Sequence, residues 1–425
     1  GIMVQCREKR YLLFTTMVVH TSSKWLSPWC ELAARNACAS SCYPELKGLH
    51  CDGSGPSVEM WRCDSLEPLS EQNCTCSLNK KLYNFLEACG DSAPGSVRVF
   101  APGEHNITCY RIPAIVRTER GTLLAFAEAR HGGCGDGLVH EIAMRRSTDH
   151  GKTWSDSTPF IVGGQSYFVG NPYPISMDSG RVAVVFVNHT GGHGPDLGSG
   201  NAVVFSDDDG VTWSKPMIIS GGFGKAQGSL PGPGAGVELD TGRLLVVSHH
   251  NAYVNDYITY SDDAGRTWNT LNRTFPKMDE GTFAGLGGGE VLLNMRHRDE
   301  PALGRGVARS FDGGLTWTNV TFDKTLIGPA CQGSLAAIGG SVYFSNPAST
   351  TDRSSLTVRR SDDGGRTWTA KLEIQKGVSA GYSSLVQGSV GDAMHGGILY
   401  ESTTPGSLDF KVFPLDLHED FSTFF

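Results

Sequence analysis

Short, mainly apolar runs of the kind that form β-strands fill the chain after about residue 97. Five pairs of such runs follow one another: Thr122–Glu128 with Glu141–Arg146, Arg181–Val187 with Ala202–Phe205, Arg243–Ser248 with Tyr257–Tyr260, Glu290–Met295 with Val307–Arg309, and Val342–Ser345 with Ser355–Arg360. A sixth set consists of Ser383–Gln387, Gly397–Glu401 and Phe410–Phe413. The 54 glycines and 20 prolines are spread along the chain, which is typical of tight turns between strands. The pattern predicts an all-β fold.

An octapeptide of the form S-x-D-x-G-x-T-W recurs five times between these runs, at intervals of about 50 residues, the length of a propeller blade. The copies are Ser147–Trp154, Ser206–Trp213, Ser261–Trp268, Ser310–Trp317 and Ser361–Trp368. The sixth set lacks the motif, as expected of a terminal repeat that closes the ring with a strand from near residue 100. We therefore predict a six-bladed β-propeller spanning residues 97–425.

The residues of the octapeptide indicate a structural role remote from catalysis. Its aspartate accepts hydrogen bonds from nearby backbone N–H groups and fixes a hairpin turn, and its glycine supplies a positive φ. We expect the threonine and tryptophan to begin the next strand, with the indole packed between blades. Since such turns also occur in propellers that only bind proteins, function must rest on other residues.

Residues 1–96 form a separate cysteine-rich extension in this interpretation. Nine of the twelve cysteines lie before residue 90, which favours a disulfide-stapled segment made in an oxidising compartment. Because nine is odd, one cysteine is free or pairs outside the cluster. Zinc binding is the alternative, but no CxxC…CxxC spacing supports it, and we predict no metal and no cofactor.

Charge and targeting signals limit the class of binding partner and the cellular compartment. A net charge of -8 argues against nucleic-acid binding. Five N-x-S/T sequons (Asn73, Asn106, Asn188, Asn272 and Asn319) fit the secretory pathway, with the lysosome or the cell exterior as end point. Arg7–Arg10 followed by Tyr11–Val19 resembles the start of a signal peptide, with a short buried helix or strand as the alternative. The apolar run is far shorter than the ~18–20 residues of a membrane span.

Several motifs resemble the sialidase family. Tyr110-Arg111-Ile112-Pro113 is similar to its [FY]-R-I-P signature. The segments GTLLAFAEAR (121–130), SNP (345–347) and GYSSL (381–385) resemble the lysosomal and bacterial-type branch. The resemblance covers roughly three quarters of the chain and does not extend to the first ~95 residues. It implies a glycosidase that removes terminal sialic acid.

The resemblance implies that three arginines hold the substrate carboxylate: Arg111, Arg296 and Arg353. Guanidinium groups suit this task because they are always charged and form forked pairs with carboxylates. Arg298 and Arg359 are nearby competitors, which we interpret as solvated surface residues.

The family uses a tyrosine nucleophile, because a second carboxylate would repel this anionic sugar. By resemblance the nucleophile is Tyr382 in GYSSL, and its partner is Glu280, sixteen residues before Arg296. A phenol has a pKa near 10, so it needs such a base at neutral pH. Glu290 is the competitor, but it opens a predicted strand. The GTFAG that follows Glu280 departs from the family pattern.

The remaining matches complete the predicted site. Asp136, in the glycine-rich loop HGGCGDG, is the candidate acid and base, with a plain turn as the alternative. Arg130 resembles a residue that helps to bind the sugar, and Glu401 resembles the acid that orients Arg111. Cys109 and Cys134 flank Arg111 and Asp136, and the sequence leaves open whether they pair.

These residues together predict an exo-α-sialidase that retains configuration and acts on glycoproteins, glycolipids or oligosaccharides. A trans-sialidase, which passes the sugar to another glycan, is one alternative, although we identify no acceptor platform. A catalytically silent propeller that binds sialylated partners or proteins is the other, but none of the three catalytic candidates is missing. If the protein is lysosomal, the resemblance also implies a partner carboxypeptidase.

Overall fold

The computed structural model of the chain describes residues 95–137, 140–161, 167–190, 200–219, 229–250, 253–390 and 393–417, together with four short strands nearer the start. The chain divides into two compact units, Gly1–Pro94 and Gly95–Phe425. The first contains the strands β1 (Ile2–Cys6), β2 (Lys9–Thr15), β3 (Ser57–Glu59) and β4 (Gln72–Asn73), paired in that order. Strand β2 takes up part of the signal-like stretch. The rest of that stretch and most of the cysteine-rich extension lie outside the described residues.

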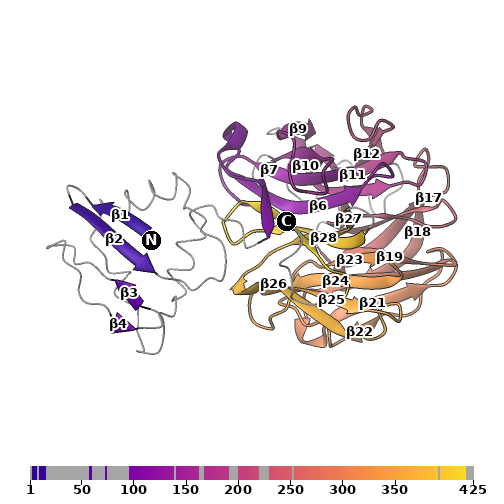
Figure 1. Cartoon of the computed structure of the whole chain (residues 1–425). Coiled ribbons are helices and arrows are strands. Elements are labelled where there is room, and N and C mark those ends of the chain that lie inside the picture. The colour runs from indigo at the N-terminus through magenta and orange to yellow at the C-terminus, as the bar shows by residue number, and fades with distance from the viewer. Residues whose placement is uncertain are drawn as a thin grey trace. The chain divides into compact units, whose positions relative to one another are not determined.

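The described strands of the second unit form six antiparallel sheets, the blades of a propeller (Figure 1). The first blade consists of β6 (Cys109–Arg117), β7 (Leu123–Arg130), β8 (His140–Ser147) and β9 (Thr158–Ile161). The second consists of β10 (Tyr167–Ser176), β11 (Val182–Thr190), β12 (Asn201–Ser206) and β13 (Met217–Ile218). In the third, β14 (Ser229–Pro231) and β15 (Val237–Glu238) both pair with β16 (Leu244–His250), which is followed by β17 (Asn255–Ser261) and β18 (Asn269–Pro276).

The other three blades repeat this order. The fourth consists of β19 (Met278–Gly287), β20 (Glu290–His297), β21 (Arg305–Ser310) and β22 (Thr321–Asp323). The fifth consists of β23 (Ser334–Ile338), β24 (Ser341–Pro347), β25 (Ser354–Ser361) and β26 (Ala370–Ser379). The sixth consists of β27 (Ser383–Val390), β28 (Ala393–Glu401), β29 (Leu408–Phe413) and β5 (Ser96–Phe100).

Strand β5 closes the ring by pairing with β29, which confirms the predicted six-bladed propeller and its closing strand. In Figure 1 the yellow strands of the last blade accordingly lie beside β6 of the first. Helical structure among the described residues is limited to two single turns, η1 (Glu104–Asn106) and η2 (Pro301–Leu303). No described helix has the length and apolar character of a membrane-crossing segment.

The octapeptides form the expected turns. In all five, the first carboxylate oxygen of the aspartate accepts a hydrogen bond from the threonine N–H at 2.8 to 2.9 Å. The indoles pack between blades. The ring centroid of Trp154 lies 5.5 Å from that of Phe410 in the sixth blade, and the ring centroid of Trp213 lies 6.1 Å from that of Phe126 in the first. One detail of the prediction is wrong. Threonine and tryptophan still belong to the turn, and the outermost strand begins only after them.

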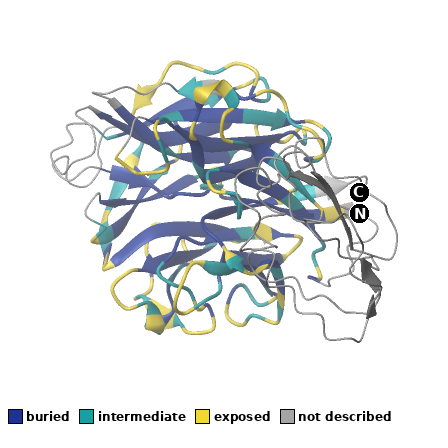
Figure 2. Cartoon of the chain, turned by 90° about the vertical axis from the view of Figure 1, so that its left-hand side faces the viewer, coloured by how far each residue is buried: buried dark blue, intermediate teal, exposed yellow. Residues whose placement is uncertain are grey.

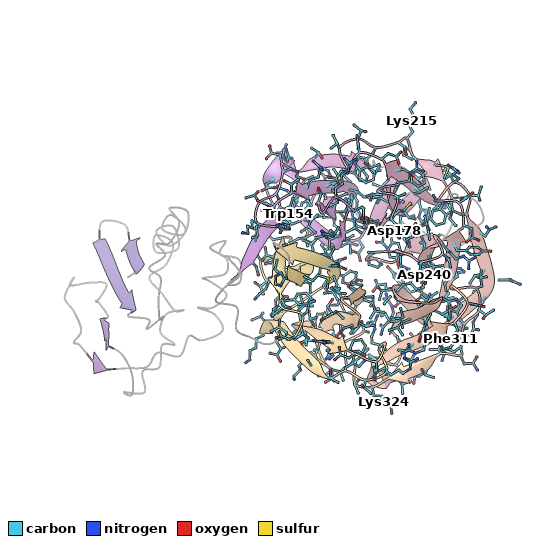
Figure 3. All side chains as sticks on the ribbon, turned by 45° about the vertical axis from the view of Figure 1, so that its right-hand side comes forward. Trp154, Asp178, Lys215, Asp240, Phe311 and Lys324 are labelled. Atoms are coloured by element: carbon cyan, nitrogen blue, oxygen red, sulfur yellow. A yellow bond between two sulfur atoms is a disulfide. The ribbon has the colours of Figure 1, made fainter. Side chains whose placement is uncertain are left out.

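Most buried residues of the second unit lie on the strands of the blades. Buried strands form the body of the ring, and exposed residues lie mainly on the connecting loops (Figure 2). Lys215 and Lys324, on loops at opposite edges of the view, project away from the ring (Figure 3). The apolar clusters combine residues of neighbouring blades, so the core lies between the sheets.

Candidate active site

The predicted site residues lie at one end of the blades because of strand direction. In an antiparallel pair, the start of the innermost strand lies beside the end of the second strand. Arg111 is near the start of β6, and Arg130 ends β7. The same holds for Glu280 and Arg296 on β19 and β20. Residues from different blades therefore meet at the same mouth of the ring.

Bulges in three innermost strands point side chains toward this mouth. The register shifts between Arg111 and Ala114, between Gly170 and Tyr173, and between Asp279 and Thr282. Each bulge contains a residue in the left-handed region: Ile112 (φ 57°), Asn171 (φ 45°) and Glu280 (φ 45°). A bulge inserts an extra residue and redirects its neighbours. A left-handed β-branched residue such as Ile112 is rare and costs about 1–3 kcal/mol, which is typical of functional sites.

Tyr382, immediately before β27, meets Glu280 at the centre of the site. The Tyr382 hydroxyl donates to Glu280 Oε1 at 2.5 Å, and both side chains are buried. Arg296 donates through one nitrogen to Glu280 Oε2 at 2.5 Å and to the Tyr382 oxygen at 3.3 Å. Phenol, carboxylate and guanidinium thus form one buried cluster.

The charge states within this cluster follow from their surroundings. Burial raises the pKa of Glu280, but Arg296, His249 and the hydrogen bonds from Tyr382 and Arg296 outweigh it, so this pKa is below its usual value. Burial and the nearby Glu280 carboxylate raise the pKa of Tyr382 well above 10. Without substrate, Glu280 is therefore an anion and Tyr382 a neutral phenol. Glu280 is poised to accept the phenolic proton.

Arg111 is held by Glu401 at the end of β28. Its Nε donates to Glu401 Oε1 at 2.9 Å, and a terminal nitrogen lies 3.5 Å from Oε2. Glu401 also accepts from the backbone N–H of Ile112 at 3.3 Å and of Tyr382 at 3.2 Å. Burial lowers the pKa of Arg111, but Glu401 and Tyr382 more than offset this effect and raise it above its usual value.

Arg353 precedes β25, and its side chain reaches the ring of the same tyrosine. The guanidinium carbons of Arg111 and Arg353 lie 5.3 and 5.5 Å from the Tyr382 ring centroid. Arg353 is exposed, whereas Arg296 is buried. Three guanidiniums therefore surround one phenol, an arrangement suited to an anion placed beside its oxygen.

Arg130 joins the centre of the site to the loop that carries Asp136. One terminal nitrogen donates to the Cys134 carbonyl at 2.5 Å and to Asp136 Oδ1 at 2.7 Å. Arg111 contacts the same Asp136 oxygen at 3.3 Å. Cys109 and Cys134 form a disulfide, which resolves the alternatives that the sequence left open.

These residues surround a cavity that opens to solvent. Seven of the eight predicted site residues line it: Arg111, Arg130, Asp136, Glu280, Arg296, Arg353 and Tyr382. The eighth, Glu401, does not line the cavity and is hydrogen-bonded to Arg111. Among the described residues, no three histidine, cysteine, aspartate or glutamate side chains are arranged to hold a metal ion.

Two of the three competing residues, Arg298 and Arg359, have surroundings that differ from those we expected, whereas Glu290 opens β20 as predicted. Glu290 pairs with Arg309 and Arg366 at 3.1 and 3.0 Å and does not line the cavity. Arg359 is buried and donates to Asn346, so its interpretation as a solvated residue is wrong. Arg298 lines the cavity mouth, donates to Asp279 at 2.9 Å and stacks over Tyr253 at 4.0 Å.

Sequence reasoning missed several other residues that line the cavity: Ile112, Glu128, His140, Phe168, Asn171, Leu230, His249 and Tyr253. Glu128 carried a usable signal. It lies two residues before Arg130 on the same strand, so both side chains share one face. It pairs with Arg130 at 2.5 Å. Asn171 carried no such signal, because its position depends on the bulge in β10.

Comparison with known proteins shows similarity to a repeat-domain profile and to sialidases. The profile described as a BNR repeat-like domain matches residues 121–395. A sialidase of Bacteroides fragilis is 32% identical over 76% of this chain and 65% of its own length. A sialidase of Micromonospora viridifaciens is 32% identical over 71% of this chain and 51% of its own. The chain thus spans about half to two thirds of these relatives. The solved structure of the Hadza microbial sialidase Hz136 aligns with a TM-score of 0.66 at 29% identity, covering 75% of this chain and 68% of that protein.

Proposed function

We propose that this chain, which belongs to the sialidase family, is an exo-α-sialidase that releases terminal sialic acid from glycans with retention of configuration. The observation that carries the proposal is the cluster of Tyr382, Glu280 and Arg296 in the open cavity. Two further guanidiniums, those of Arg111 and Arg353, flank the same phenol.

The substrate explains this combination. Sialic acid bears a carboxylate on its anomeric carbon, so a carboxylate nucleophile would approach another anion. A neutral phenol avoids this repulsion, and the three guanidiniums of Arg111, Arg296 and Arg353 neutralise the substrate carboxylate. Sialidases are an exception to the usual pair of carboxylates in glycosidases.

Tyr382 is the nucleophile in the proposed reaction. Glu280 Oε1 takes the phenolic proton while the Tyr382 oxygen attacks the anomeric carbon. Asp136 donates a proton to the glycosidic oxygen, whose bond to that carbon breaks, and the aglycone leaves as an alcohol. The product of this step is a sialyl-tyrosine.

Water completes the reaction. Asp136, now a carboxylate, takes a proton from the water that attacks the anomeric carbon, and the Tyr382 oxygen leaves and regains its proton from Glu280. Two displacements at one carbon restore the original configuration. Arg130 binds the sugar and holds Asp136, and Glu401 orients Arg111.

A fluorogenic sialoside assay between pH 4 and 7 tests the proposal. We expect release by the wild type and none by a Tyr382→Phe, Asp136→Ala double variant. Proton NMR of the first product should find the α-anomer. The proposal fails if wild type and double variant do not differ at any pH, or if the β-anomer forms first.

We also propose that the chain passes through the secretory pathway. Asn106, Asn272 and Asn319 are exposed, whereas Asn188 on β11 is 5% exposed and so inaccessible in the folded protein. Mass spectrometry of protein expressed in a eukaryotic secretory system should find glycans at the exposed sequons and not at Asn188. Complete absence of glycans would count against the proposal.

A further inference from the structure

The loop that carries Asp136 contains little that would hold it in one conformation by itself. It has glycines at 132, 133, 135 and 137, and glycine loses more backbone freedom on ordering than any other residue. Most of the loop is exposed, and 65% of the Asp136 side chain is accessible. The contacts that anchor the loop therefore determine where the carboxyl group lies.

One anchor is the Cys109–Cys134 disulfide. Cys109 belongs to β6 and is fully buried. A Cβ at Gly406, in the last hairpin of the sixth blade, would lie 3.1 Å from the Cys109 sulfur, so this end of the bond is embedded in the ring. Cys134 at the other end is exposed. Each cysteine lies two residues before a site residue, Arg111 or Asp136. One covalent bond therefore ties the acid to the carboxylate clamp, the name we give to Arg111, Arg296 and Arg353.

The second anchor is Arg130, whose hydrogen bonds to the Cys134 carbonyl and Asp136 are given above. Arg130 is itself fixed from behind: Glu128 Oε2 accepts from its Nε at 3.0 Å and from a terminal nitrogen at 2.5 Å. Glu128 Oε1 accepts from the backbone N–H of Asn171 at 2.8 Å. This anchor is noncovalent. Its hydrogen bonds to the loop form only while the Cys134 carbonyl and the Asp136 carboxylate both lie within hydrogen-bonding distance of the same Arg130 nitrogen.

We propose that the Cys109–Cys134 disulfide is a positioning element for Asp136, which keeps its carboxyl group at the glycosidic oxygen and so sets the rate of the acid-assisted step. The inference rests on the proposed function. It predicts a selective defect, because a displacement of about 1 Å in a reacting group costs on the order of 100-fold in rate. The buried cluster of Tyr382, Glu280 and Arg296 has no member on the loop and remains in place.

The leaving group makes this selectivity measurable. An alcohol leaves only with a proton from the acid, whereas a phenol with electron-withdrawing substituents leaves as an anion. We expect a Cys109→Ala, Cys134→Ala variant to lose about 10- to 100-fold in the single-turnover rate constant for release of lactose from 3′-sialyllactose. The loss for an activated aryl sialoside should stay within about threefold, and binding of an unsaturated sialic-acid analogue should change little.

A double-mutant cycle identifies the residue through which the disulfide acts. In an Asp136→Ala background, removal of both cysteines should cost less than about twofold on sialyllactose. Equal losses on the two substrates, no loss on sialyllactose, or losses that add in the Asp136→Ala background would each overturn the inference. A wild type that releases sialic acid from neither substrate would instead overturn the proposed function.

Chemical reduction replaces the variant if the latter does not fold. A dithiol reduces the bond to two thiols and is itself oxidised to a cyclic disulfide, and the exposed Cys134 gives it access. Blocking the new thiols by alkylation and locating them by mass spectrometry shows which protein molecules lost this bond. The same substrate selectivity is expected in the wild type, and none in Asp136→Ala; a uniform loss again overturns the inference.

Discussion

Glu401 offers the sharpest test of how the site is assembled, because its carboxylate accepts from four N–H groups and does not line the cavity. The partners are two nitrogens of Arg111 and the backbone N–H groups of Ile112 and Tyr382. Glu401→Gln keeps the size but replaces one acceptor oxygen by an NH₂ group. Whichever way the amide turns, two donors lose their acceptor.

The expected loss can be worked from these contacts. A hydrogen bond that involves a charged group contributes about 1.5–3 kcal/mol, and a buried donor left without a partner costs about 1–3 kcal/mol. The Arg111 side chain is 19% exposed and also contacts Asp136, so water and that carboxylate compensate in part. A net loss of about 2 kcal/mol corresponds to about a 30-fold fall in kcat/KM. Because Arg111 binds the substrate carboxylate in both the ground and the transition state, KM should carry much of the fall.

Steady-state kinetics with a fluorogenic sialoside, and inhibition by an unsaturated sialic-acid analogue, measure the effect. Asp262→Asn is the matched control. Asp262 pairs with Arg243 through two contacts, at 2.6 and 3.2 Å, at the opposite end of the third blade. The control should keep wild-type kinetics. Activity of Glu401→Gln within threefold of wild type, or an equal fall in both variants, would refute the reasoning.

Three further predictions follow from single positions. Arg353→Lys keeps the charge but loses the forked pair, so KM should rise about tenfold; an unchanged KM would remove Arg353 from the carboxylate clamp. Gly265 and Gly242 both have positive φ, but only at Gly265 would an added Cβ lie 2.7 Å from the Phe205 ring. Urea unfolding should therefore show that Gly265→Ala lowers the free energy of unfolding by about 2–4 kcal/mol and Gly242→Ala by about 1 kcal/mol. Equal losses in the two variants would contradict this packing. Burial lowers the pKa of His249 to about 4, so the unfolded chain takes up a proton below pH 6.5 before the folded chain does, and stability is lost as pH falls from 6.5 to 4. In His249→Phe this loss should be smaller by about 3 kcal/mol, and an unchanged pH dependence of unfolding would contradict the assignment.

The fold could be predicted because its signals are local. Each octapeptide fixes its own turn through hydrogen bonds between residues four apart, such as Thr212 N–H to Asp208, and its indole marks the boundary to the next blade. The absence of the motif after the fifth copy indicated the closing blade, where β5 pairs with β29.

The site was predictable only in part. Resemblance identified eight residues, and the structure brings them together around one phenol, while their catalytic roles stay predictions. The left-handed bulges at Ile112 and Glu280 are features of the backbone that the order of apolar and polar residues does not reveal. The place of Arg298 against Tyr253 depends on a turn from another blade. Arg359 is buried through Asn346, a contact that no spacing along the chain predicts.

Trapping of the glycosyl-enzyme tests the central claim most directly. A 2,3-difluoro sialic acid carries a good leaving group at the anomeric carbon, and its second fluorine slows breakdown of the intermediate. After brief incubation, digestion and tandem mass spectrometry, the account predicts one fluorosialyl group on the oxygen of Tyr382. An adduct on Glu280, Asp136 or any other residue, or turnover of the reagent without an adduct under conditions that trap intermediates, would contradict it.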